Sequence, residues 1–265
     1  MKKILKNIIP LDEIKKSINY IEKQSLINPI LESKDDRGEY LFQRLHYNQI
    51  MSSNSIKNLL FHEPLIKKIK KNIGSFYLIN YIHAKINSFG SNTHRDGQSF
   101  GFNYEGIKNS SKIIKVLFYF NKNSLNIPKG YGLDVNLLDL NLKNIFFYKK
   151  LFMKINFYYE HYLRSRIMQT LKISAGDVVL MDNNTWHRGS LNKFRPTDKE
   201  SFEVQKILLD YEIITDKNLA FEYAKHVRKT FLSLNEVNTD NLNLDLFDAN
   251  YIKMLKRNDI EVINI

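Results

Sequence analysis

Three side chains in two separated segments have the types and spacing needed to hold a metal ion. The segment SNTHRDGQ carries His94 and Asp96, and the segment GDVVLMDNNTWHRGS carries His187. Two imidazoles and one carboxylate are the set with which non-haem Fe(II) oxygenases bind iron, leaving three coordination positions open. The chain is therefore a candidate iron-dependent oxygenase, with these three residues as metal ligands.

The spacing of the first segment fits a β-strand. Side chains two residues apart in a strand point to the same face, so His94 and Asp96 can bind one ion while Arg95 points away. The alternative is a histidine in a turn, because Asp96-Gly97 is a common turn dipeptide. A short motif of this kind is weak evidence until a second segment supports it.

The second segment has the pattern of a strand with punctuation at both ends. An apolar, β-branched run in LKISAGDVVLMDNN begins after the Ala-Gly-Asp turn at 175–177 and ends at Asp-Asn-Asn at 182–184. We expect this strand to deliver His187 at its end or at the rim of a sheet, where it can meet the first segment in space.

These segments, with KIIKVLFYFN and YGLDV between them, resemble the phytanoyl-CoA dioxygenase-like family of Fe(II)/2-oxoglutarate oxygenases over about residues 74–211. The resemblance implies a mainly β fold with flanking helices (α+β), built on a double-stranded β-helix core of jelly-roll or cupin type. It implies that His94, Asp96 and His187 are the catalytic iron ligands. It also implies Fe(II) as cofactor and 2-oxoglutarate and O2 as cosubstrates. Related halogenases have a small residue where this chain has Asp96, so the resemblance implies hydroxylation of a C–H bond or another oxidation.

The chain differs from this family where an arginine usually binds the distal carboxylate of 2-oxoglutarate, because Asp198 stands there. The expected replacement is Lys206, in the strand FEVQKILLDYEI. Lysine can act there as a point charge, without the bidentate fork of arginine. The alternatives are Arg195, which precedes Pro196 in a loop, and an outward-facing Lys206 with no such role. Ser190 is a further candidate for a hydroxyl contact to the same carboxylate.

The length of 265 residues fits a single oxygenase domain. We expect an N-terminal helical part at 1–73, a β-helix core at 74–215 with a helical insert at about 143–167, and a C-terminal helical part at 216–265. Helices are predicted at 11–26, 53–72, 218–234 and 251–256, with Ser53 or Asn54 and Asp216 as caps and Gly74 after the second. The aromatic residues Phe100, Phe102 and Tyr104 are expected near the substrate pocket or in the core, and His226 at the surface.

The absence of cysteine excludes disulfides, thiolate metal sites and a cysteine nucleophile. The lysines at the N-terminus precede an interrupted apolar stretch rather than the continuous one of a signal peptide. The sequence also lacks an apolar run long enough to span a bilayer. We therefore expect a soluble, cytoplasmic protein.

The formal net charge of +12 favours anionic partners. The alternative is that the excess of lysine reflects a general bias in composition and not a function, because the chain is also rich in Asn, Ile, Tyr and Phe. It contains no recognised nucleic-acid module, so nucleic acid is not the expected partner. We expect a small anionic metabolite or cell-envelope glycan precursor as substrate. The basic, amphipathic insert at 143–167 either packs against the sheet or allows peripheral membrane contact.

Two other classes of protein stay open at the level of sequence. One is a metal-dependent enzyme on the same fold that does not use 2-oxoglutarate, which the missing arginine permits. The other is a non-catalytic jelly-roll binding protein, whose sheets can hold a ligand without chemistry.

Overall fold

The computed structural model describes residues 2–27, 31–34, 41–45, 47–86, 96, 102, 112–121, 132–136, 168–189, 206–233 and 249–263. Several predictions fall outside these residues: the insert at 143–167, His94, Phe100, Tyr104, Ser190 and Arg195.

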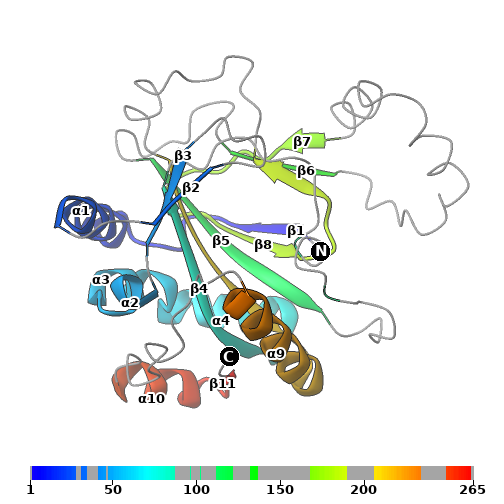
Figure 1. Ribbon diagram of the computed structural model, residues 1–265. Coiled ribbons are helices and arrows are strands. Elements are labelled where there is room, and N and C mark those ends of the chain that lie inside the picture. Colours follow the sequence, from blue (N-terminus) through cyan, green and yellow to red (C-terminus); the bar gives the residue numbers. More distant parts are fainter. Residues whose placement is uncertain are drawn as a thin grey trace, which may run out of the picture.

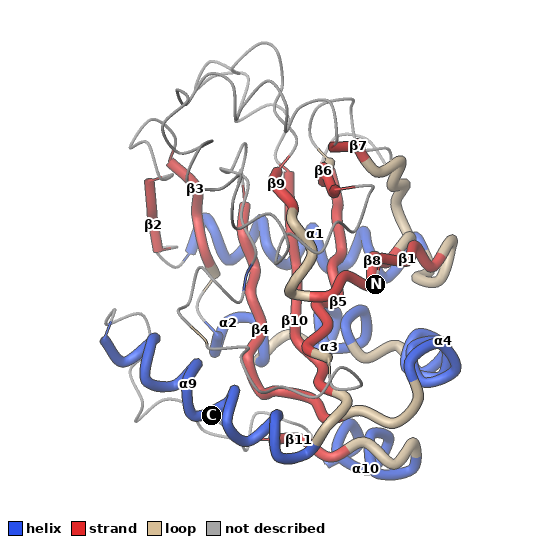
Figure 2. The backbone as a smooth tube through the Cα atoms, turned by 90° about the vertical axis from the view of Figure 1, so that its right-hand side faces the viewer, coloured by secondary structure: helices blue, strands red, loops and turns tan. Residues whose placement is uncertain are grey.

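The described chain is built on a large, eight-stranded sheet. Its order is β1 (Lys2–Leu5), β8 (Val178–Asp182), β5 (Ile113–Asn121), β10 (Lys206–Ile214), β4 (Tyr77–Ile86), β3 (Leu41–Arg44) and β2 (Leu31–Lys34). These neighbours are antiparallel, while β11 (Glu261–Ile263) runs parallel to β4. Strands that are remote in sequence thus become neighbours at the centre of the sheet (Figure 2).

A second, three-stranded sheet has the order β7 (Met168–Thr170), β6 (Leu133–Asn136) and β9 (His187–Gly189). Figure 1 shows it on one side of the large sheet, with α1 (Leu11–Ile27), α2 (Tyr47–Met51) and α3 (Asn54–Leu60) on the other. The described architecture is therefore a mixed, sheet-rich α+β fold.

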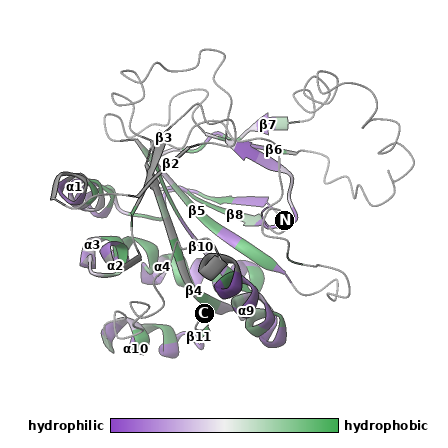
Figure 3. Ribbon diagram, viewed as in Figure 1, coloured by the Kyte–Doolittle hydropathy of each residue, from purple (hydrophilic) through white to green (hydrophobic). Residues whose placement is uncertain are grey.

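The alternation of the central strands sends apolar side chains to both faces of the large sheet. In β5, Val116 and Phe118 pack with the helices, whereas Leu117 and Tyr119 pack with Leu133 and other residues of the smaller sheet. Successive strand residues point to opposite faces, so one strand serves both layers. The helix-side core also includes residues of α4 (Glu63–Ile73) and α10 (Ala249–Arg257), and these helices have a hydrophobic and a hydrophilic side (Figure 3).

The single helix predicted at 53–72 is wrong, because the structure has two helices there. The side chain of Ser53 caps α3 by accepting a 3.2 Å hydrogen bond from the backbone N–H of Ile56. Pro64 lies in the first turn of α4, where a residue without an N–H is tolerated; within a continuing helix it would disrupt the preceding turn. Gly74, with φ of 82°, ends α4 as predicted.

The C-terminal helices are confirmed. Asp216 caps α9 (Lys217–Ser233), since its Oδ1 accepts a 2.9 Å hydrogen bond from the N–H of Leu219. Helix α10 covers the predicted 251–256. The strands β1, β2, β3 and β11 were not predicted. No helix among the described segments combines the length and the apolar character needed to cross a membrane.

The N-terminal segment is fastened to the turn that opens β8. The buried carboxylate of Asp177 accepts hydrogen bonds from Lys6 Nζ at 2.6 Å and from the backbone N–H of Asn7 at 2.9 Å. Gly176 has φ of 86°, and a Cβ there would lie 2.8 Å from the carbonyl oxygen of Ile9. Only glycine fits this turn without strain, and the turn sets where β8 begins.

Candidate active site

His187 lies where the turn after β8 leads into the smaller sheet. In that turn the N–H of Thr185 donates to the carbonyl of Asp182 at 2.7 Å. His187 is then the first residue of β9, opposite Val135 of β6, and it is buried between the sheets. The prediction that a punctuated strand delivers this histidine at a strand end is confirmed.

A backbone carbonyl fixes the tautomer of the His187 ring. The Nδ1 atom lies 3.0 Å from the carbonyl oxygen of Thr185. Because a carbonyl oxygen can only accept a hydrogen bond, Nδ1 carries the hydrogen. The lone pair of the neutral ring is therefore on Nε2, which is how a metal-binding histidine is usually oriented.

Asp96 faces that nitrogen, although it comes from a remote part of the sequence. Its Oδ2 lies 3.4 Å from Nε2 of His187, and Asp96 is only 6% exposed. This separation is longer than the usual N–H···O distance of about 2.9–3.0 Å. Two ligand atoms each about 2.1 Å from one metal, at an angle of about 90–110°, lie about 3.0–3.4 Å apart. The two atoms therefore fit neighbouring positions on one ion.

The described residues include two of the three predicted metal ligands, Asp96 and His187. Within the part of the chain that the structure covers, no group of three His, Cys, Asp or Glu side chains is arranged so that it could hold a metal ion. The third predicted ligand, His94, lies outside that part.

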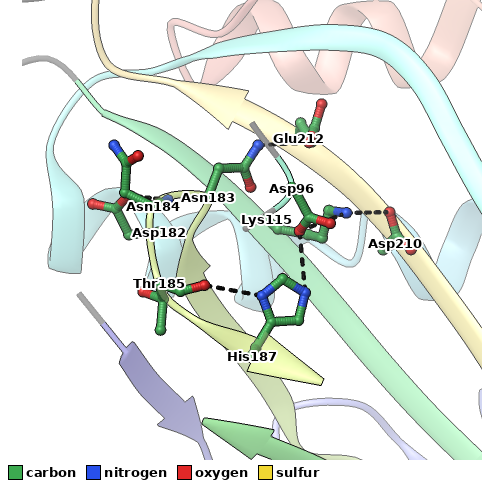
Figure 4. Close-up of polar contacts among 9 residues, drawn as sticks. All are labelled: Asp96, Lys115, Asp182, Asn183, Asn184, Thr185, His187, Asp210 and Glu212. Atoms are coloured by element: carbon green, nitrogen blue, oxygen red, sulfur yellow. Dashed lines mark hydrogen bonds and ion pairs between the residues drawn. The ribbon is translucent and has the colours of Figure 1, made fainter. Parts of the chain in front are cut away.

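A lysine that was not predicted adjoins the pair. Lys115 of β5 places Nζ 3.0 Å from Oδ2 of Asp96 and 3.8 Å from Oδ1 of Asp210 on β10. The side chains of Lys115 and Asp96 are each 9% exposed, so this ion pair is shielded from water. Figure 4 shows the Asp96 carboxylate between the lysine and the imidazole.

Glu212 of β10 completes the polar cluster. The register of the two strands sets Lys115 opposite Glu212 and Leu117 opposite Asp210. The Glu212 Oε1 atom accepts a 2.8 Å hydrogen bond from Nδ2 of Asn183, in the turn that precedes His187 (Figure 4). Three strands, β5, β9 and β10, thus meet the turn after β8 and Asp96 around one buried group of charges.

Burial and the charge of neighbouring groups have opposing effects on the pKa values of Lys115 and Glu212. Burial lowers the pKa of Lys115, but Asp96, Asp210 and Glu212 outweigh it and hold that pKa above its ordinary value. Burial raises the pKa of Glu212 above its ordinary value, although Lys115, Asn183 and Tyr223 favour the ionised carboxylate. Lys115 is therefore a permanent cation, while Glu212 retains its proton to a higher pH than an exposed glutamate.

The cluster contains three carboxyl groups, of Asp96, Asp210 and Glu212, and one ammonium group, of Lys115. When all are ionised, the carboxylates exceed the ammonium by two charges. Buried charges require partners of opposite sign or a metal. A divalent cation beside Asp96 and His187 would balance this group.

Of the three residues expected to bind the cosubstrate, only Lys206 lies in the described part of the chain. Lys206 begins β10, with its backbone opposite Asn121 of β5, but its side chain lies outside the described structure. Phe102 packs edge-on against Tyr223, with ring centroids 5.1 Å apart, and also contacts His226. Phe102 is thus a partly buried aromatic that packs against the core, and His226, expected at the surface, is half-buried.

The residues that sequence analysis missed had a recognisable signal. Lys115 interrupts the buried run IIKVLFYFN, and Asp210 and Glu212 alternate with apolar residues in KILLDYEII. A charged residue inside an apolar strand points to an interior partner or a ligand, because unpaired buried charges are costly. The partners themselves depend on the pairing of β5 with β10.

No family model and no curated protein sequence matches this chain. Solved structures do match its fold. The non-heme alpha-ketoglutarate-dependent epimerase SnoN from nogalamycin biosynthesis is 11% identical, with a TM-score of 0.52 over 81% of this chain and 77% of its own. SnoN in complex with Fe3+, alpha-ketoglutarate and nogalamycin RO is 10% identical, with a TM-score of 0.53 over 81% and 78%. The carbocyclase SnoK from the same biosynthesis is 8% identical, with a TM-score of 0.53 over 80% and 79%. At these identities the likeness concerns the fold alone: the chain has the fold of non-heme alpha-ketoglutarate-dependent enzymes.

Proposed function

We propose that the protein is an Fe(II)/2-oxoglutarate-dependent oxygenase. The observation that carries the proposal is the meeting of Asp96 and His187 at 3.4 Å, buried between two sheets, in a chain with the fold of such enzymes. In this proposal the two sheets are the halves of a double-stranded β-helix, and the family is the phytanoyl-CoA dioxygenase-like one.

Asp96, His187 and the sequence-predicted His94 are proposed to bind the iron. His187 is already oriented for this role, because Thr185 holds the hydrogen on Nδ1. Iron bound by this set, with 2-oxoglutarate and O2, supplies oxidation of a C–H bond, and hydroxylation is the proposed outcome. The buried interior around Asp96 and His187 keeps bulk water from the reacting atoms.

Lys206 is proposed to bind the distal carboxylate of 2-oxoglutarate, with Arg195 and Ser190 as the alternatives. Its position supports this role. Lys206 lies four residues before Asp210 on β10, which is about 13 Å along a strand at about 3.3 Å per residue. That leaves a lysine side chain and a five-carbon diacid enough length to reach the metal ligands.

The proposed substrate is a small molecule, as in the SnoN complex with nogalamycin RO. A metabolite or glycan precursor with an anionic group is compatible with the net charge of +12. Three carboxyl groups lie beside the proposed metal, so the anionic group is expected to bind away from Asp96, Asp210 and Glu212.

The test is anaerobic titration of the metal-free protein with Fe(II) and then 2-oxoglutarate, followed by visible absorption. We expect a metal-to-ligand charge-transfer band that is absent in His187→Ala. We also expect Lys206→Met to require at least about tenfold more 2-oxoglutarate, because it loses a charged contact. Failure of the wild type to bind Fe(II) would contradict the proposal and favour a non-catalytic binding protein.

The excess of buried carboxyl groups favours a second candidate, a metal-dependent enzyme on the same fold that does not use 2-oxoglutarate. Asp210 and Glu212 are both buried near the proposed metal, and a dianionic cosubstrate must overcome their repulsion. The same titration separates the two candidates. Tight binding of Fe(II) without any band on addition of 2-oxoglutarate supports the second.

A further inference from the structure

We propose that Lys115 is a positioning residue for the metal-binding carboxylate of Asp96. Its ammonium holds the carboxylate in the orientation that faces His187. This inference rests on the proposed function, because it assumes that Asp96 binds a metal.

The contact is a close ion pair between two buried side chains. The Nζ–Oδ2 distance is 3.0 Å, and the same Oδ2 faces Nε2 of His187 at 3.4 Å. Both partners of the ion pair are buried. Hydrogen bonds to metal-binding carboxylates and histidines fix the orientation of these ligands, and losing one typically costs about 10–100-fold in metal affinity.

Lys115 is itself held in place from β10. Asp210 lies 3.8 Å from its ammonium, and Glu212 is its direct neighbour across the β5–β10 ladder. Oppositely charged side chains at facing and diagonal positions of antiparallel strands stabilise each other. The rotamer of Lys115 is thus constrained by the sheet, so the lysine can orient Asp96 rather than follow it.

Asn183 links this arrangement to the histidine. It donates to Glu212 at 2.8 Å and lies in the turn that leads to His187, whose ring is fixed by Thr185 of the same turn. The carboxylate and the imidazole are therefore oriented by one connected set of buried contacts. Lys115 is the member that touches Asp96.

The experiment compares metal binding by the full-length wild type, Lys115→Met and a matched control, Lys57→Met. Lys57 of α3 is also buried, at 5% exposed, but it lies over the ring of Tyr251 in the helical layer. Co(II) is the probe, because it binds nitrogen and oxygen ligands and its visible spectrum reports the geometry of its coordination. Thermal unfolding of each variant shows that it is folded.

We expect Lys115→Met to raise the Co(II) dissociation constant about 10–100-fold and to change the visible spectrum. Lys57→Met is expected to leave the constant within about threefold and the spectrum unchanged, because its site is remote. If methionine at 115 does not give a folded protein, Lys115→Gln replaces it with the same expected loss, since a shorter, neutral amide cannot keep the ion pair.

A folded variant at 115 that binds Co(II) as tightly as Lys57→Met, with the same spectrum, would overturn the role of Lys115. In that outcome the wild type still binds the metal, so the proposed function stands. If the wild type binds neither Co(II) nor Fe(II), the proposed function fails first.

Discussion

The two faces of the central strands carry different kinds of residue. Toward the helices, β5 and β10 present Val116, Phe118 and Leu209 to an apolar core. Toward the smaller sheet, the same strands present Lys115, Asp210 and Glu212, all buried. The backbone and the hydrogen-bond ladder are shared, so only the alternation of side chains separates the two faces.

Within one strand, the residues on one face contribute mainly to stability, and those on the other face to the proposed chemistry. The helix-side face excludes water and stabilises the sheet by apolar burial. The inner face accepts buried charges that lower the stability of a fold unless they are paired, which is typical of residues retained for function. Substitutions at alternating positions should therefore change different properties of the protein.

The largest effect on stability is expected from the helix-side face. Phe118→Ala removes a fully buried ring that contacts Phe120 and Tyr211. It should lower the free energy of unfolding by about 3–5 kcal/mol, measured by urea denaturation. The Co(II) affinity of the folded variant should stay within about threefold of the wild type, because the ring points away from Asp96. A large loss of affinity would show that the two faces are not separable.

A smaller, pH-dependent effect is expected from Glu212→Gln on the inner face. Burial raises the pKa of Glu212 above its ordinary value of 4.5, so the folded protein keeps this proton at pH values where the unfolded chain has lost it. Stability from this group is fully present below about pH 4.5 and falls as the pH rises through the folded pKa. Glutamine can still accept the hydrogen bond from Asn183 and does not titrate.

The measurement for Glu212→Gln is the free energy of unfolding at several pH values, compared with the wild type. The difference in favour of the variant should grow from pH 4.5 upward. Parallel curves for the two proteins would contradict the raised pKa of Glu212.

The smallest effect is expected from the solvent-exposed side of α9. Lys225 pairs with Glu222 at 2.9 Å, but their side chains are 74% and 65% exposed. Lys225→Ala should shift the melting temperature by less than about 2 °C, since exposed ion pairs add little. This variant sets the baseline against which changes on the two buried faces are judged, and a larger shift would show that α9 contributes more than its contacts suggest.

The parts of the fold that local pattern determines were predictable from the sequence. Strand β8 and the strand-end position of His187 follow from an apolar run between turn residues. The cap at Asp216 and the end of α4 at Gly74 are likewise local signals. The break between α3 and α4 could also have been predicted, because Pro64 disfavours a continuous helix.

The rest depends on contacts between remote segments. The β1 strand has only four residues, and it is a strand because it pairs with β8 and is fastened through Asp177. The role of Lys115 could not be read from β5 alone, because it requires the register with β10 and the position of Asp96. Charged residues in apolar strands were visible in the sequence, but their partners were not.

The most direct test of the account is a crystal structure of the iron-loaded protein with anomalous diffraction at the iron absorption edge. We expect one iron peak about 2.0–2.2 Å from Nε2 of His187 and from a carboxylate oxygen of Asp96, with Lys115 still paired with that carboxylate. A peak bound elsewhere, or no iron between these two side chains, would contradict the proposed metal site.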